Sequence, residues 1–257
     1  MDLGTYYTEY ISSYALPFTR IGGVLMVMPL IGTQLVGKSV RIILAMLITF
    51  AIAPQIPITT ATEPGTLLWV VLAAKELLIG VAMGLVVQML FQALVVGGQT
   101  IAMQAGLGFA QLVDPVNGVS VAAISQLYLL MANIFFFSTN GHLAVFQVMA
   151  ESFHQLPVGF SAWDKVSLIN QSMFKTVTWL FASGLLIALP VVISLLMVNL
   201  TFGVISKMAP QFNVFSFGFA FTVVVGILVV GVSLPRILPT FEVLTEQALI
   251  LMRGFYG

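Results

Sequence analysis

One stretch of this chain is almost free of charge. From Leu77 to Ala150, 74 consecutive residues include a single formally charged side chain, Asp114. Over the whole chain of 257 residues, charged side chains make up 7%, against about 25% in a soluble globular domain. Hydrophobic residues make up 60%. Because a charge at mid-bilayer costs several kcal/mol, this composition favours a chain that folds in lipid or within a large apolar assembly.

The charge pattern and the missing residue types exclude several functions. Nine basic and nine acidic residues cancel, and the basic ones are scattered, so no basic face is available for nucleic acid. Without cysteine there are no disulfides, thiolate metal sites or cysteine nucleophiles. Glu151 and His154 have the spacing of half a di-iron site, but no second Glu-x-x-His exists. We therefore expect no enzyme activity, no metal and no cofactor.

Windows free of charge predict an all-α, membrane-associated fold of helical hairpins with about six long apolar helices. About 20 apolar residues are needed to cross the hydrocarbon of a bilayer. The first window tolerates Arg20, which is expected to snorkel. Residues 138–175 are expected to form the one long polar connection. The six windows are 14–35, 40–53, 67–96, 121–137, 176–202 and 217–234. Their ragged lengths fit helices packed on other subunits at least as well as helices facing lipid throughout.

The C-terminal segment has a different pattern. Apolar residues recur there at helical spacing, and Glu242, Glu246 and Arg253 lie off the apolar stripe. This predicts an amphipathic helix that lies on a membrane or partner, or folds back on its own bundle. The stripe consists of Phe241, Leu244, Ala248, Leu251 and Phe255.

A glycine-rich segment interrupts the uncharged stretch around Asp114. Three glycines, an Asp-Pro and an Asn-Gly predict a loop. An irregular backbone at membrane depth survives only inside protein or beside a water-filled cavity. Two interpretations stay open: an exterior turn, or a re-entrant loop that lines a conduit. The candidate conduit-lining residues are Gly106, Leu107, Gly108, Phe109, Leu112, Asp114, Pro115, Asn117 and Gly118.

Neutral amides and small residues mark candidate helix contacts. The amides favour interhelical hydrogen bonds, with a wet pathway as the alternative. Gly80 and Gly84 form a small-xxx-small pair that allows close helix contact. Lys75 beside Glu76 indicates a polar boundary or, less favoured, an intersubunit ion pair. The candidate amides are Gln88, Gln92 and Gln99 on one helical face, Gln126 and Asn133 on another, and Asn199.

Residues Gly32–Ser39 fit the phosphate-binding pattern G-x-x-x-x-G-K-[ST] letter for letter. The mechanism of that motif requires a preceding strand and a nearby carboxylate for magnesium. A long apolar run precedes the pattern here, so we expect a tight turn between two helices, with Lys38 and Arg41 at the polar boundary.

Several motifs in order resemble the FliR family of the bacterial flagellar export gate and its type III secretion relatives. The resemblance covers nearly the whole chain, and the match at 140–143 and 156–159 favours the flagellar branch. The motifs are LPFTR (16–20), the turn at 29–41, FAIAP (50–54), QAGLGFA (104–110), VDP (113–115), NGHL (140–143), FHQLPVG (153–159), ALP (188–190), Asn199 and KMAPQ (207–211).

The resemblance implies a non-enzymatic subunit of a protein-conducting gate in the bacterial inner membrane, at the flagellar basal body. It implies FliP, FliQ and FlhB as partners, with exported flagellar proteins in transit and membrane lipid in contact. It also implies a FliP-like part, residues 1–172, and a FliQ-like hairpin with the C-terminal helix, residues 173–257. Residues 106–120 would form the plug loop. The alternative function is a six-helix ion or solute transporter or channel, for which no paired broken helices are found.

Overall fold

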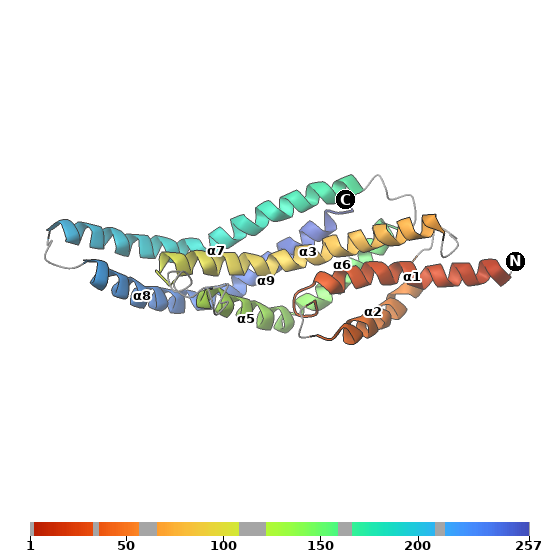
Figure 1. The fold of residues 1–257 in the computed structure, drawn as a ribbon, viewed down its shortest axis with the longest axis horizontal. Coiled ribbons are helices and arrows are strands. Elements are labelled where there is room, and N and C mark those ends of the chain that lie inside the picture. Colours follow the sequence, from red (N-terminus) through yellow and green to blue (C-terminus); the bar gives the residue numbers. More distant parts are fainter. Residues whose placement is uncertain are drawn as a thin grey trace. The chain divides into compact units, whose positions relative to one another are not determined.

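The structure, a computed structural model, describes residues 3–32, 36–56, 66–107, 122–158, 166–208 and 214–256. Within these ranges the chain is helical, as Figure 1 shows in sequence colours. This confirms the predicted all-α fold. The elements are α1 (Leu3–Val27), α2 (Lys38–Ile52), η1 (Ala53–Gln55), α3 (Leu67–Gln104), α5 (Ala123–Ser138), α6 (Gly141–Gln155), α7 (Val166–Met208), α8 (Val214–Ser233), η3 (Leu234–Arg236) and α9 (Ile237–Arg253).

Four stretches of the described chain are long and apolar enough to cross a membrane, and the pair α5 and α6 adds a fifth if it is one broken span. The prediction of about six long apolar helices was therefore close. The four stretches are Lys38–Gln55, Leu67–Gln104, Ile169–Met208 and Ala220–Arg253.

The chain divides into two compact units, and α3, α7 and α9 each contribute to both. Unit 1 comprises residues 1–89, 140–177 and 246–257, and unit 2 comprises residues 90–139 and 178–245. Each unit contains residues from both of the parts named in the sequence analysis, 1–172 and 173–257.

In unit 1, α1 and α3 pack through glycine. A Cβ at Gly80 would collide with the carbonyl oxygen of Arg20, and one at Gly84 would lie 2.9 Å from the carbonyl oxygen of Val24. A Cβ at Gly23 would in turn lie 2.8 Å from the carbonyl oxygen of Leu77. The close contact predicted for Gly80 and Gly84 is confirmed.

Unit 2 has an aromatic core and its own glycine contacts. Phe91 makes edge-on contacts with Phe136 and Phe241, at ring centroid separations of 5.3 and 6.1 Å. A Cβ at Gly98 would lie 2.6 Å from the Cα of Ser125. Gly98 therefore lets the backbones of α3 and α5 approach where a side chain would not fit. Helix α3 itself extends to Gln104, beyond the predicted end at Val96.

The predicted polar connection at 138–175 was wrong. It contains α6, and α7 already begins at Val166. Asn140 adopts the left-handed conformation, with φ 58°, and the α6 helix begins at the next residue. The apolar positions of α6 recur at helical spacing and are buried, namely Val145, Val148, Met149 and Phe153.

The C-terminal amphipathic helix is confirmed as α9, and it packs on its own chain. Phe241, Leu244, Ala248 and Phe255 are buried, while Glu242, Glu246 and Arg253 are exposed. Leu251, the fifth residue of the predicted stripe, is only half-buried, and its neighbour Met252 is buried instead. Of the two interpretations left open for this helix, the structure shows the one that folds back.

Candidate functional site

The glycine-rich loop begins where α3 ends. The amide of Ala105 still donates to the carbonyl oxygen of Ile101, and Gly106 then turns the chain with a φ of 81°. A glycine in this conformation is the common way to terminate an α-helix. Leu107 follows and is half-buried. The other candidate conduit residues lie outside the described part of the chain, namely Gly108, Phe109, Leu112, Asp114, Pro115, Asn117 and Gly118.

Two of the six candidate amides accept hydrogen bonds between helices of unit 2. The Oε1 of Gln99 accepts from the amide of Ala122 at 3.1 Å and from the hydroxyl of Ser125 at 3.3 Å. The Oδ1 of Asn199 in α7 accepts from the hydroxyl of Thr222 in α8 at 3.1 Å. The other four are half-buried, as Gln88 and Asn133 are, or exposed, as Gln92 and Gln126 are.

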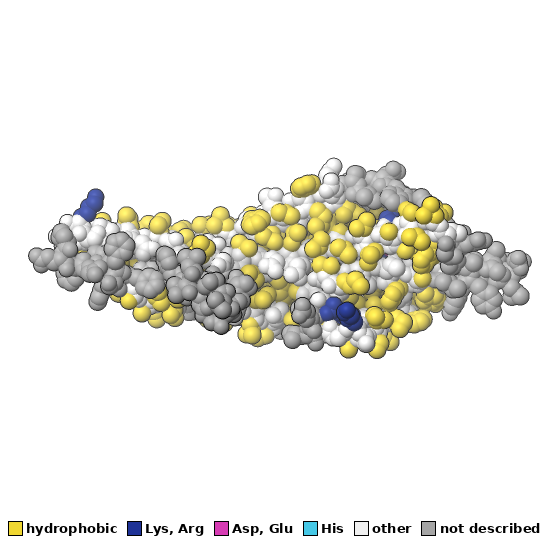
Figure 2. All heavy atoms as spheres, in the orientation of Figure 1, with side chains coloured by type: hydrophobic (Ala, Val, Ile, Leu, Met, Phe, Trp, Pro, Cys, Tyr) yellow, Lys and Arg dark blue, Asp and Glu magenta, His cyan; other side chains and the backbone are white. Residues whose placement is uncertain are grey.

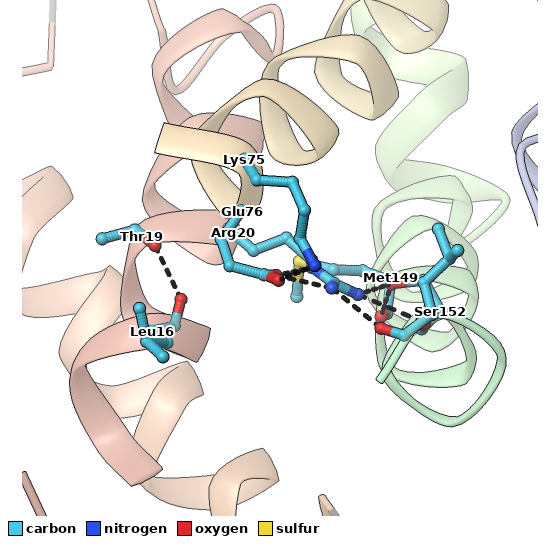
Figure 3. Close-up of polar contacts among 8 residues, drawn as sticks. Leu16, Thr19, Arg20, Lys75, Glu76, Met149 and Ser152 are labelled. Atoms are coloured by element: carbon cyan, nitrogen blue, oxygen red, sulfur yellow. Dashed lines mark hydrogen bonds and ion pairs between the residues drawn. The ribbon is translucent and has the colours of Figure 1, made fainter. Parts of the chain in front are cut away.

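A buried cluster of charges in unit 1 is the site that sequence reasoning missed. Arg20 of α1 donates from Nε to Oε2 of Glu76 in α3 at 2.6 Å, and both side chains are fully buried. Lys75, 2% exposed, places its Nζ 3.4 Å from the other oxygen of Glu76. Figure 3 shows the three charged groups converging between the two helices. Two cations thus share one carboxylate inside the unit.

The same arginine also holds α6. Its Nη1 donates to the carbonyl oxygen and the hydroxyl of Ser152, each at 3.2 Å, and its Nη2 donates to the carbonyl oxygen of Leu156 at 2.9 Å. The guanidinium carbon lies 4.3 Å from the ring centroid of Phe153. Because a guanidinium presents five donors in a planar fork, one side chain can join three helices. This residue fixes α1, α3 and α6 against one another.

These contacts correct two expectations. Arg20 does not snorkel, because its charge is satisfied inside the protein. Lys75 and Glu76 form neither a polar boundary nor a pair between subunits, because both lie buried in their own chain. The signal was present in the sequence: charges inside apolar runs are costly unless they are paired. The distance of 56 residues between Arg20 and Glu76 hid which charges pair.

Two other candidate motifs are also placed. The residues before the phosphate-loop pattern form helix α1 and not a strand, and Gly37 is the N-cap of α2. The pattern therefore lacks the strand that its mechanism requires. His142 of the NGHL motif lies in the first turn of α6. In the described ranges no group of three His, Cys, Asp or Glu residues is arranged to hold a metal.

Large apolar side chains cover much of the described surface, as the hydrophobic atoms in Figure 2 show. The C-terminal end of α7 is the clearest case. From Leu196 to Met208 no residue is buried. This end contacts α8 through the rings of Phe202 and Phe221, whose centroids are 5.1 Å apart. The described chain therefore has two notable features, the buried ion cluster of unit 1 and exposed apolar faces such as the end of α7. These faces need lipid or protein to cover them.

Comparison with known proteins identifies a family and several relatives that are similar to this chain. Residues 11–248 match the family described as bacterial export proteins, family 1. Flagellar biosynthetic protein FliR of Escherichia coli (strain K12) is 33% identical over 245 residues, which is 95% of this chain and 92% of that protein. The FliR of Pectobacterium carotovorum subsp. carotovorum is 33% identical over 244 residues, with the same coverage. The FliR of Aquifex aeolicus (strain VF5) is 32% identical over 235 residues, covering 91% and 90%.

The matched region takes in α2 to α8 completely, together with the buried charge cluster and the glycine contacts of both units. The apolar helices agree with a place in a membrane. The chain therefore belongs to bacterial export protein family 1, the family of the FliR proteins, and is a membrane-embedded component of flagellar export.

Proposed function

We propose that this chain is a non-enzymatic subunit of the flagellar type III protein export gate. It forms part of the protein-conducting channel together with FliP-type and FliQ-type subunits, and FlhB associates with it. The gate lies in the bacterial inner membrane at the flagellar basal body. In this proposal residues 1–172 correspond to a FliP-like part, and residues 173–257 correspond to a FliQ-like hairpin with the C-terminal helix.

The observation that carries the proposal is the length of α7. Its part in unit 2, residues 178–208, alone spans about 46 Å at 1.5 Å per residue. The hydrocarbon of a bilayer is about 30 Å thick. An apolar helix of that length has more surface than lipid covers without a steep tilt. Its last 13 residues, none of them buried, are therefore best covered by helices of other subunits.

We further propose that residues 106–120 form a plug that closes the channel before export. Gly106 supports this, because its positive φ turns the chain at the C-terminal end of α3. Leu107, Phe109 and Leu112 supply apolar bulk that excludes water. Asp114 and the turn residues around it are then tolerated because they lie inside the assembly and not in lipid.

The experiment compares the chain alone with the chain co-expressed with FliP-type and FliQ-type subunits of the same bacterium. We expect co-purification, and a higher midpoint of thermal unfolding in the complex than for the isolated chain. Leu200→Arg, on the exposed end of α7, should abolish co-purification of the FliQ-type subunit, while Leu200→Met should preserve it. A monomer with the same unfolding midpoint in both samples would refute the proposal.

A further inference from the structure

A groove in unit 1 lies between α1, α2 and the N-terminal part of α3. Its volume is about 670 Å³. Helix α1 contributes Phe18, Gly22 and Met26, helix α2 contributes Ile42 and Ala45, and α3 contributes Leu77. From Phe18 to Met26 the groove follows α1 for about 12 Å. These dimensions and this lining suit a hydrocarbon chain.

The only formal charges lining this groove are positive. Lys38 and Arg41 both come from the first turn of α2. The guanidinium of Arg41 is oriented by a hydrogen bond from Nη2 to the carbonyl oxygen of Val36, at 2.9 Å. Lys38 is exposed, and its ammonium makes no hydrogen bond or ion pair with the described part of the chain. Dark blue basic atoms stand among yellow apolar ones near the position of α2 in Figure 2.

Helix α2 has the dimensions of a segment exposed to lipid. The apolar stretch Lys38–Gln55 is 18 residues long, about 27 Å, close to the thickness of the hydrocarbon. Only 17% of this stretch is buried, in contrast to 56% of the most apolar part of α3. In a bilayer that α2 crosses, its basic residues at one end of this length would lie at the level of the lipid phosphates. An apolar length close to the hydrocarbon thickness, with basic residues at one end, matches the acyl chain and phosphate of a lipid better than it matches a partner helix.

We propose that this groove binds one anionic phospholipid, with an acyl chain along Gly22 and Ile42 and the phosphate at Lys38 and Arg41. Apolar grooves between membrane helices that carry basic residues at the headgroup level have this chemistry. The acyl chain would cover the apolar side chains that α1 and α2 expose in the groove. The proposal rests on unit 1 alone and does not depend on the proposed channel.

Glycine offers a clean way to block the groove. A Cβ at Gly22 would meet no atom within 4 Å, so a larger side chain enters the groove without displacing the helices. Gly231 in α8 is equally unobstructed and does not line the groove. Gly22→Leu and Gly231→Leu are therefore a matched pair. Lys38→Gln with Arg41→Gln removes the groove charges, and Lys175→Gln with Arg236→Gln removes two exposed charges elsewhere.

The test uses the full chain, co-expressed with FliP-type and FliQ-type subunits and reconstituted into phosphatidylcholine vesicles. The vesicles contain a trace of phosphatidylglycerol or of phosphatidylcholine with a photoreactive diazirine in the acyl chain. Labelled peptides are identified by mass spectrometry after illumination. We expect phosphatidylglycerol to label peptides of 18–26 and 42–45 at least fivefold more than phosphatidylcholine does, since each basic residue favours an anionic headgroup by about fivefold.

The variants decide between occupants. Gly22→Leu should abolish this labelling with both probes, and Lys38→Gln with Arg41→Gln should bring the two probes to parity, while the two control variants should behave as wild type. Equal labelling of wild type by both probes, or labelling unaffected by Gly22→Leu, would overturn the proposal. So would labelling that occurs only when the partner subunits are omitted, because the groove would then be a protein interface. Size-exclusion profiles of all variants establish that each one assembles.

Discussion

Glu76 is the centre of the buried charge cluster, because both cations depend on its carboxylate. Removing one partner of a buried ion pair costs about 3 to 5 kcal/mol, since it leaves a charge uncompensated. The three members are nevertheless unequal. Without Arg20, the carboxylate still has Lys75 at 3.4 Å. Without Lys75, the pair between Arg20 and Glu76 stays whole.

We therefore expect an order of destabilisation among three single substitutions. Glu76→Gln should lower the midpoint of thermal unfolding most, because it leaves two buried cations without a carboxylate. Arg20→Met should follow, because it leaves the carboxylate with Lys75 alone. Lys75→Met should be close to neutral, because the pair between Arg20 and Glu76 stays whole. The measurement is thermal unfolding, in detergent, of the protein purified after co-expression with the proposed partner subunits.

The exposed pair between Arg253 and Glu151 is the control. Its Nε and Oε2 lie 3.1 Å apart, and the two side chains are 48% and 39% exposed. Exposed ion pairs contribute about 0 to 1 kcal/mol, so Arg253→Met should change the midpoint little. If Lys75→Met proved as damaging as Glu76→Gln, the assignment of the carboxylate as the shared partner would be wrong.

The start of α6 depends on the backbone of one residue. Asn140 has φ 58° and ψ 26°, a left-handed conformation that Asn and Gly adopt readily and β-branched residues adopt rarely. Its carbonyl oxygen accepts hydrogen bonds from the amides of Leu143 and Ala144, at 3.0 and 3.2 Å. The residue thus both turns the chain and opens the helix.

We expect Asn140→Val to destabilise the protein by about 1 to 2 kcal/mol, because valine is strained in this conformation. Asn140→Gly should be nearly neutral, since glycine adopts a positive φ without a steric penalty. Chemical denaturation of the two variants in the same detergent gives the comparison. Equal stability of Val and Gly variants would show that the left-handed conformation at this position is not required.

Most helices could be predicted from the sequence because apolar windows are long and charges are few. The ends were harder to predict, for a physical reason. Residues 138–175 were predicted to form one polar connection, yet α7 begins at Val166, because a helix that leaves the apolar region can continue through polar residues. The window predicted for α3 ended at residue 96, but the helix continues to Gln104, and its Gly97 and Gly98 pack closely against Gly184 and Ser125.

The candidate site was less accessible to sequence reasoning than the fold. A glycine-rich run and a lone carboxylate in an apolar stretch are visible locally, so residues 106–120 could be singled out. The buried cluster required knowing that α1, α3 and α6 meet, which is tertiary information. The small apolar residues that line the groove beside Lys38 carried no signal of their own, because such residues are common in any membrane helix.

For the assembled gate, the proposed plug leads to a prediction about leakage. Deleting residues 108–118 should leave the complex assembled and make the membrane permeable to ions or small solutes, because Phe109 and Leu112, two of the three large apolar side chains of the proposed plug, would be missing. The measurement is conductance or influx of a small dye in cells that express the full gate with and without the deletion. A shortened gate that assembles normally and stays as tight as wild type would show that the loop is an ordinary turn.

The wide separation in sequence of the groups around Arg20 also sets an order of events during synthesis. Glu76 follows it by 56 residues and Ser152 by 132. At about 5 to 20 residues per second, the guanidinium waits about 3 to 11 s for its carboxylate and about 7 to 26 s for the backbone of α6. During that interval α1 carries an uncompensated charge that opposes its entry into the membrane. Among the described helices α1 is synthesised first, yet its buried charge is among the last to be compensated.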